Sequence, residues 1–256
     1  MHSFRVALRI AALVFVALVL RGSYINQPAP STPIFPSTGT PAFVRAVENH
    51  NSGAPTSLSV SFGTLPAVAN IVIVGPETSS ALGTGLNVTD NQGNSYSRLI
   101  LQPSSSIGAV SPRVSLWCTV VATSSGTFTT TATVDTDSAN ALMQIFALEY
   151  AGTTCNPDAL AGTIGSTSPY SCGSNTTRNG HDLLLTFLGT AGSTTTITYT
   201  APASFTTRIS QGVAATGITG AIADDIVTAT STYTPTFSAS QNVAFSPCAF
   251  ITLMSK

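Results

Sequence analysis

Residues 57–62 read Ser-Leu-Ser-Val-Ser-Phe, and this strict alternation of polar and apolar side chains predicts a β-strand. Successive side chains of a strand point to opposite faces, so Leu58, Val60 and Phe62 would share one face and the serines the other. A strand with one apolar and one polar face is typical of an antiparallel sheet that covers a core on one side.

Comparable runs, rich in Val, Ile, Thr and Phe and separated by Gly, Asn, Pro and Ser, recur along the chain. Two of them, 71–74 and 183–188, are almost wholly apolar and should lie at the centre of the packing. From residue 43 onward no stretch of ten residues has helical spacing of apolar side chains, and no strand–helix alternation appears. We therefore expect an all-β fold, a jelly-roll-like antiparallel β-sandwich of about a dozen short strands. The expected strands cover residues 43–49, 57–62, 70–75, 85–89, 95–101, 113–121, 126–134, 142–150, 182–189, 195–199, 204–210, 217–223, 232–237 and 242–253.

The segment 88–96, Val-Thr-Asp-Asn-Gln-Gly-Asn-Ser-Tyr, has strand residues at both ends and turn residues between them. Asp and Asn side chains bond to nearby backbone, and Gly93 or Asn94 can adopt a positive φ. We expect a β-hairpin here.

Further motifs follow this segment in a set order. They are Arg-Val-Ser-Leu-Trp-Cys-Thr-Val-Val at 113–121, Phe-Ala-Leu-Glu-Tyr-Ala-Gly at 146–152 and His-Asp-Leu-Leu-Leu-Thr-Phe-Leu-Gly at 181–189. The series resembles the β-sandwich modules, jelly-roll or immunoglobulin-like, of secreted bacterial surface proteins. The resemblance spans roughly residues 57–253 and implies an extracellular β-sandwich, without implying any catalytic residue. The cysteine-containing segment 155–172 is not part of it.

The N-terminal residues predict export. Arg5 and Arg9 accompany an uninterrupted apolar run at 10–20, which is the pattern of a signal peptide and is shorter than a membrane span. We expect residues 1–23 to be a signal peptide or an N-terminal anchor, and the proline-rich residues 24–42 to be a linker. Residues 43–256 would then form a single β-sandwich domain. The expected location is secreted or cell surface, with membrane contact only through the N-terminal segment if it is uncleaved.

Charge is scarce. Charged residues make up 7% of the chain, against about 25% in an ordinary globular protein, while 43% of the residues are hydrophobic. After residue 21 only six scattered basic residues face ten acidic ones. No basic stripe is available to neutralise phosphates, so we expect no nucleic-acid partner.

The chain has four cysteines, Cys118, Cys155, Cys172 and Cys248. An even number in an exported chain favours disulfides, and three pairings are open. Cys155 and Cys172 bracket a segment rich in turn formers that lacks a strong strand, and a bridge between them would restrict it. Cys118 and Cys248 could pair if their strands are neighbours, or could remain buried thiols. Neither CxxC spacing nor nearby histidine indicates a metal site.

Few residues suggest catalysis. Glycoside hydrolysis needs two carboxylates facing one cleft, and Glu149, at the end of an apolar strand, is the most prominent candidate for one of them. The same position suits a buried, hydrogen-bonded structural carboxylate. Residues 135–140 offer alternating oxygen ligands but lack the glycine and terminal glutamate of an EF-hand loop. Trp117 lies mid-strand and is expected in the core. We expect no catalytic, cofactor-binding or metal-binding residue.

These observations favour a non-catalytic extracellular or cell-surface module with a structural, adhesive or display role. A carbohydrate-binding module with a surface glycan as partner is one alternative. A secreted glycoside hydrolase-like enzyme using Glu149 and a second carboxylate is another. Self-association is also expected, because threonine-rich strands with few charges lack the lysines that block strand addition at sheet edges.

Overall fold

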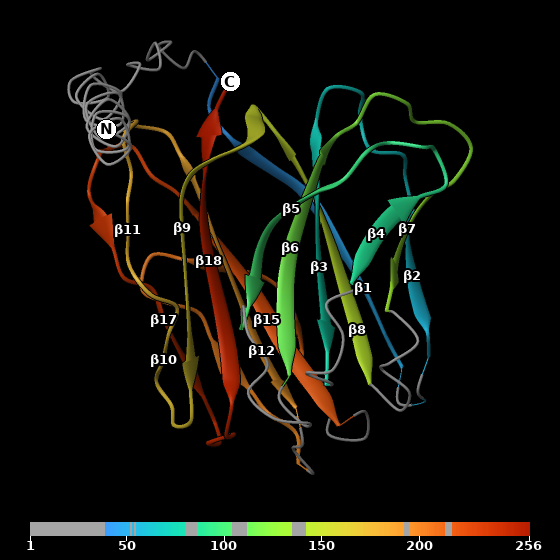
Figure 1. Ribbon diagram of the computed structural model, residues 1–256. Helices are drawn as coiled ribbons and strands as arrows, with labels where there is room; N and C mark the ends of the chain where they lie inside the picture. The colour runs from blue at the N-terminus through green and yellow to red at the C-terminus, as the bar shows by residue number, and fades with distance from the viewer. Residues whose placement is uncertain are drawn as a thin grey trace, which may run out of the picture. The chain divides into compact units, whose positions relative to one another are not determined.

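The computed structural model describes residues 39–51, 53, 55–79, 86–103, 112–134, 142–191, 195–212 and 217–256. These residues form eighteen β-strands and no helix (Figure 1), which confirms the all-β prediction with more strands than expected. No described residue belongs to a helix that could cross a membrane. The strands are β1 (Ala42–Asn51), β2 (Ser57–Phe62), β3 (Ile71–Thr78), β4 (Asn87–Asp90), β5 (Ser97–Gln102), β6 (Arg113–Val120), β7 (Phe128–Thr133), β8 (Met143–Ala151), β9 (Thr153–Gly165), β10 (Tyr170–Ser171), β11 (Asn175–Thr176), β12 (Leu183–Ala191), β13 (Tyr199–Thr200), β14 (Thr206–Gln211), β15 (Ile218–Ile226), β16 (Thr232–Tyr233), β17 (Thr236–Ala239) and β18 (Ser246–Ser255).

The strands build a sandwich of four layers. Two five-stranded antiparallel inner sheets, in the orders β1-β8-β3-β6-β5 and β14-β15-β12-β18-β9, pack face to face. The sheet β2-β7-β4 covers the outer side of the first, and the sheet β10-β17-β13 with the pair β11-β16 covers the outer side of the second. Three apolar clusters fill the three spaces between layers, so both faces of each inner sheet are buried.

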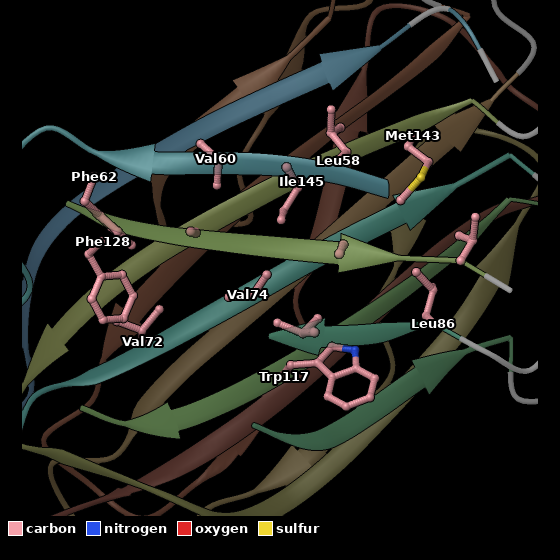
Figure 2. Packing of buried hydrophobic residues seen from close by; sticks show 14 of the residues in the cluster. Leu58, Val60, Phe62, Val72, Val74, Leu86, Trp117, Phe128, Met143 and Ile145 are labelled. Carbon is pink, nitrogen blue, oxygen red and sulfur yellow. The ribbon is translucent and has the colours of Figure 1, made fainter. Parts of the chain in front are cut away.

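Alternation along the strands sets this layering. In β2, Leu58, Val60 and Phe62 are buried and the three serines are exposed, as the sequence predicts. Figure 2 shows these side chains packed with those of the inner strands, among them Trp117 and Met143. The inner strand β3 is buried along its whole length because it has a core on either side.

The two halves of the described chain have the same fold. The first half (residues 39–151) has the inner order β1-β8-β3-β6-β5, and the second half (residues 153–256) has the matching order β9-β18-β12-β15-β14. The outer sheets β2-β7-β4 and β10-β17-β13 also correspond. The described part of the chain is therefore a tandem repeat of one unit, to which the second half adds the pair β11-β16, and the two units pack through their inner sheets.

Local irregularities repeat as well. An unpaired residue interrupts β1 at Val44 and β9 at Asp158, and β5 and β14 shift register at matching points. A non-glycine residue with positive φ comes two residues before β3 and β12, namely Ala69 (φ 70°) and His181 (φ 74°). Such irregularities are not imposed by sheet pairing, so their recurrence supports the equivalence of the halves.

The predicted hairpin at 88–96 is wrong. β4 pairs with β7 in the outer sheet, whereas β5 pairs with β6 in the inner sheet, so the turn crosses between layers. The carboxylate of Asp90 accepts hydrogen bonds from the backbone N–H groups of Gln92 (2.9 Å) and Asn94 (3.1 Å). Asn94 Oδ1 in turn accepts from the N–H groups of Ala122 and Thr123. These long-range bonds direct the outgoing chain toward the inner sheet.

The segment after Cys155 also differs from expectation. It belongs to the thirteen-residue strand β9, the longest of the described strands, which pairs with β18 at the edge of an inner sheet. Its turn-forming residues are tolerated because an edge strand has a partner on one side only. Pro157 stands beside the bulge at Asp158, where the ladder is already interrupted.

The four cysteines form two disulfides, as expected for a protein of an oxidising compartment. Cys118 pairs with Cys155 and thereby joins β6 of the first half to β9 of the second. Cys172 pairs with Cys248 and ties the outer layer of the second half to β18. The bridge considered between Cys155 and Cys172 does not form, because Cys155 lies in a strand beside the first half.

Gly39 is the first described residue, and Lys256 is the last. The N–H of Gly39 donates a hydrogen bond to the carbonyl of Lys256 (2.6 Å). Strand β1 then begins at Ala42, one residue before the predicted start of the domain. The predicted export segment and residues 24–38 of the predicted linker lie outside the described residues.

Candidate functional site

The outer face of the sheet β2-β7-β4 is covered with hydroxyl groups. The Oγ of Ser59 lies 2.7 Å from Oγ1 of Thr131, and the Oγ of Ser61 lies 2.7 Å from Oγ1 of Thr129. Thr89 of β4 continues the first of these rows, since it pairs with Thr131. The exposed positions of these three strands carry no ionised side chain. The result is an uncharged face lined by rows of paired hydroxyls.

The outer layer of the second half has the same character. Ser174 Oγ lies 2.7 Å from Thr234 Oγ1, and Thr176 Oγ1 lies 2.8 Å from Thr232 Oγ1. All four side chains are exposed. The sandwich therefore presents hydroxyl rows on both of its outer sides, and we call these two surfaces the hydroxyl faces.

Glu149, the candidate carboxylate from the sequence, is fully buried under the outer layer of the first half. Its Oε1 accepts hydrogen bonds from the N–H of Ala67 (2.8 Å) and from Asn70 Nδ2 (2.7 Å), and its Oε2 lies 2.8 Å from Arg45 Nε. The Arg45 guanidinium also donates to the carbonyls of Thr64 and Leu65. Glu149 thus ties the 64–70 loop to β1 and β8, which is the geometry of a structural carboxylate.

Asp224 connects the two halves. Tyr150 Oη of the first half donates to its Oδ2 (2.6 Å), and Arg208 Nε donates to its Oδ1 (2.6 Å). The Arg208 guanidinium lies over the ring of Phe43 at 4.3 Å from the centroid. Burial raises the pKa of Asp224, and the bonds from Tyr150 and Arg208 counteract that rise.

Glu77 and Gln144 form a buried polar pair between the inner sheets. The Gln144 amide donates to Glu77 Oε2, while Oε1 of Glu77 and Oε1 of Gln144 have no hydrogen-bond partner. Burial raises the pKa of Glu77 well above its usual value. A protonated Glu77 carries no charge, so this buried site suits a neutral carboxyl group.

A second buried pair consists of Asp158, at the bulge of β9, and Asp182, just before β12. Their carboxyl groups lie within hydrogen-bonding reach of each other. Burial and the charge of Asp158 raise the pKa of Asp182 to about 7, and the backbone amides of Asn179 and Ser255 act in the opposite direction. Sequence inspection missed this pair, because 24 residues separate its members and β18 lies between their strands.

The remaining candidates from the sequence are dispersed. Trp117 is 9% exposed and donates to Ser115 Oγ (3.0 Å), as expected of a core residue. Residues 135–140 lie outside the described residues. Within the part of the chain that the structure describes, no group of three or more His, Cys, Asp or Glu side chains could hold a metal ion.

The tyrosines do not gather into one exposed strip. Tyr170 is buried, and the hydroxyl of Tyr199 bonds to Thr190 and Thr219 (2.7 Å each).

Comparison of the chain with protein-family models, curated proteins and solved structures gives no match.

Proposed function

We propose that this protein is a non-catalytic extracellular module with an adhesive role, and that the hydroxyl faces contact neutral hydroxylated polymers, polysaccharides above all. The observation that supports the proposal is the presence of uncharged hydroxyl rows on both outer sides of the sandwich. The two disulfides are in keeping with an extracellular location.

The chemistry of the faces suits such a partner. Each hydroxyl has one donor and two acceptor sites, and pairing with one neighbour leaves further sites open to a ligand. Sugar hydroxyls have the same donor and acceptor capacity. Because the serine and threonine rows themselves carry no charge, binding through them would depend little on salt, unlike binding to a polyanion.

The described carboxylates favour a structural rather than a catalytic role. Glu149 has its oxygens engaged by Arg45, Asn70 and the backbone of Ala67, and it is buried beneath an outer layer. Asp224 is engaged by Tyr150 and Arg208. Neither presents a free carboxylate to an open cleft of the kind that glycoside hydrolysis uses.

The test is a pull-down of the full chain with insoluble polysaccharides such as cellulose, chitin and purified cell-wall sacculi, at 0.05 and 0.5 M salt. Ser59→Lys and Thr234→Lys each place a long charged side chain on one hydroxyl face, and the double variant blocks both. Val68→Lys, at an exposed loop position, is the matched control. We expect binding that resists salt, falls in the variants and is unchanged in the control.

Two results would contradict the proposal. Release of reducing sugar from any of these polymers would show catalysis. Binding that survives in the double variant would place the contact surface elsewhere on the protein.

A further inference from the structure

The pair Asp158–Asp182 lacks sufficient positive charge around it. The Asp182 side chain is fully buried and that of Asp158 is 2% exposed. Two ionised carboxylates in contact and away from water repel each other and lose their hydration, so such a pair needs a counter-charge.

The neighbours provide little of it. Asp158 Oδ2 accepts a hydrogen bond from the backbone N–H of Arg178 (2.6 Å). The Arg178 Nε is 3.6 Å from Asp158 Oδ1, but its side chain is 76% exposed, and a solvated ion pair of this kind contributes little. Neither carboxylate oxygen of Asp182 has a hydrogen-bond partner of normal geometry. The backbone amides of Asn179 and Ser255 that interact with this carboxylate carry no net charge, so they do not supply the missing counter-charge.

The site in the first half that is equivalent to the Asp158–Asp182 pair has no net charge. There the carboxylate is Glu149, paired with Arg45 and with the amide of Asn70. The matching registers of the two sheets put Thr252 at the position of Glu149 and Ala159 at that of Arg45.

The matching starts of the central strands put Asp182 at the position of Asn70. The second half therefore lacks the arginine and has a carboxylate in place of the amide, and its bulge places Asp158 where the first half has Val44. In the first half Arg45 supplies the positive charge, whereas in the second half Asp158 has only the exposed, more distant Arg178.

We propose that Asp158 and Asp182 together bind one divalent cation, Ca²⁺. The two side chains present hard carboxylate oxygens, which Ca²⁺ prefers, and Ca²⁺ accepts irregular geometry completed by water and backbone carbonyls. Transition metals favour imidazole or thiolate, and all four cysteines are in disulfides. The ion would join the edge strand β9 to the start of β12 across β18. We expect an affinity in the range of extracellular calcium modules, roughly 10⁻⁴ to 10⁻³ M.

The test compares the EDTA-treated full chain with two variants by calorimetric titration with CaCl₂ and by thermal unfolding. Asp182→Asn installs the residue found at the equivalent position 70, and Asp158→Asn removes the other charge at constant size. Glu48→Gln, which alters a half-exposed carboxylate beside His50, is the control. We expect one Ca²⁺ per chain in the parent and the control, and a rise in Tm of about 3–6 °C at ten times the Kd.

Both aspartate variants should lose the heat of binding and the rise in Tm, while their near-ultraviolet circular dichroism stays that of the parent. In the absence of Ca²⁺, Asp182→Asn should melt above the parent, because it removes one of two repelling charges. A parent protein without any Ca²⁺ effect would overturn the proposal and leave a shared proton as the counter-charge. A Ca²⁺ effect that persists in both variants would also overturn it, since the ion would then bind elsewhere.

Discussion

At the scale of single residues, the buried carboxylates are accommodated in different ways. Glu149 and Asp224 each form an ion pair with an arginine, and each also accepts hydrogen bonds from uncharged donors. Glu77 has uncharged partners, the amide of Gln144 and the backbone of Thr190, and is best accommodated as a neutral acid. A buried charge is tolerated only with a partner, so the buried acids that have an arginine partner can be ionised, whereas one without such a partner is better neutral.

Glu77 leads to a prediction about pH. Its pKa in the folded protein lies well above 4.5, so above pH 4.5 the unfolded chain releases a proton that the folded protein keeps. The free energy of unfolding therefore falls as the pH rises from about 4.5 toward the folded pKa, by about 1.4 kcal/mol per pH unit for one proton. Glu77→Gln replaces the neutral acid with an amide of the same shape and should remove this contribution.

Urea unfolding at pH 5 and pH 8 measures the effect. We expect Glu77→Gln to lose less stability than the parent between these values, and Glu48→Gln to behave like the parent. Asp182 and Asp224, whose pKa values are also raised, leave a residual slope in every variant. An equal pH dependence in the parent and Glu77→Gln would show that Glu77 is ionised in the folded protein.

At the scale of elements, the turn between β4 and β5 positions an outer sheet on an inner one. Asp90 accepts from the backbone of Gln92 and Asn94, from Asn94 Nδ2 (2.8 Å) and from Tyr96 Oη (3.2 Å). Burial, followed by the nearby charge of Asp90, raises the pKa of Tyr96, so its hydroxyl stays a donor.

Asp90→Ala should therefore lower the free energy of unfolding by about 2–3 kcal/mol, because several donors lose a charged acceptor together. Asp90→Asn keeps one acceptor oxygen and should lose about half as much. The urea midpoint checks both values. A loss below about 0.5 kcal/mol for Asp90→Ala would show that the turn is fixed by its other contacts.

Local signals predicted the strands well and their partners poorly. The alternation in residues 57–62 predicted both ends of β2 correctly, because the period-two pattern is a property of the strand itself. The turn signal at 88–96 was real, but which sheets the flanking strands join depends on bonds from Asn94 to residues 122–123. Strand β9 was missed because pairing with β18, not its own composition, makes it a strand. Asp158 and Asp182 meet only through that pairing.

At the scale of the whole molecule, the two halves are complementary where they meet. Equivalent positions face each other across the inner sheets, and at two of them one half has a glycine and the other a large side chain. A Cβ at Gly75 would lie 3.2 Å from the ring of Phe187, and a Cβ at Gly189 would lie 2.5 Å from Cδ of Glu77. A symmetric pair of either half would instead place like against like: glycine facing glycine leaves a cavity, and Phe187 facing itself overlaps.

This complementarity predicts how the protein behaves when it is divided after Gly152. Each half alone would expose one face of its inner sheet, including Ile73 and Leu148 in the first and Leu185 and Ile251 in the second. We expect each half to aggregate when produced alone, and the two halves to form a stable one-to-one complex when they are produced together in an oxidising compartment. Exposed apolar sheet faces associate because burial contributes about 25 cal/mol per Å².

Size-exclusion chromatography and non-reducing gel electrophoresis measure the outcome. The Cys118–Cys155 disulfide should link the two halves covalently, and the Cys172–Cys248 disulfide should remain within the second half. A Cys118→Ala, Cys155→Ala pair of fragments should still co-elute, since the inner-sheet contact holds them, but should separate on the gel. A soluble homodimer of either half would contradict this prediction. It would show that the packing of Gly75 against Phe187 and of Gly189 against Glu77 does not determine which halves associate.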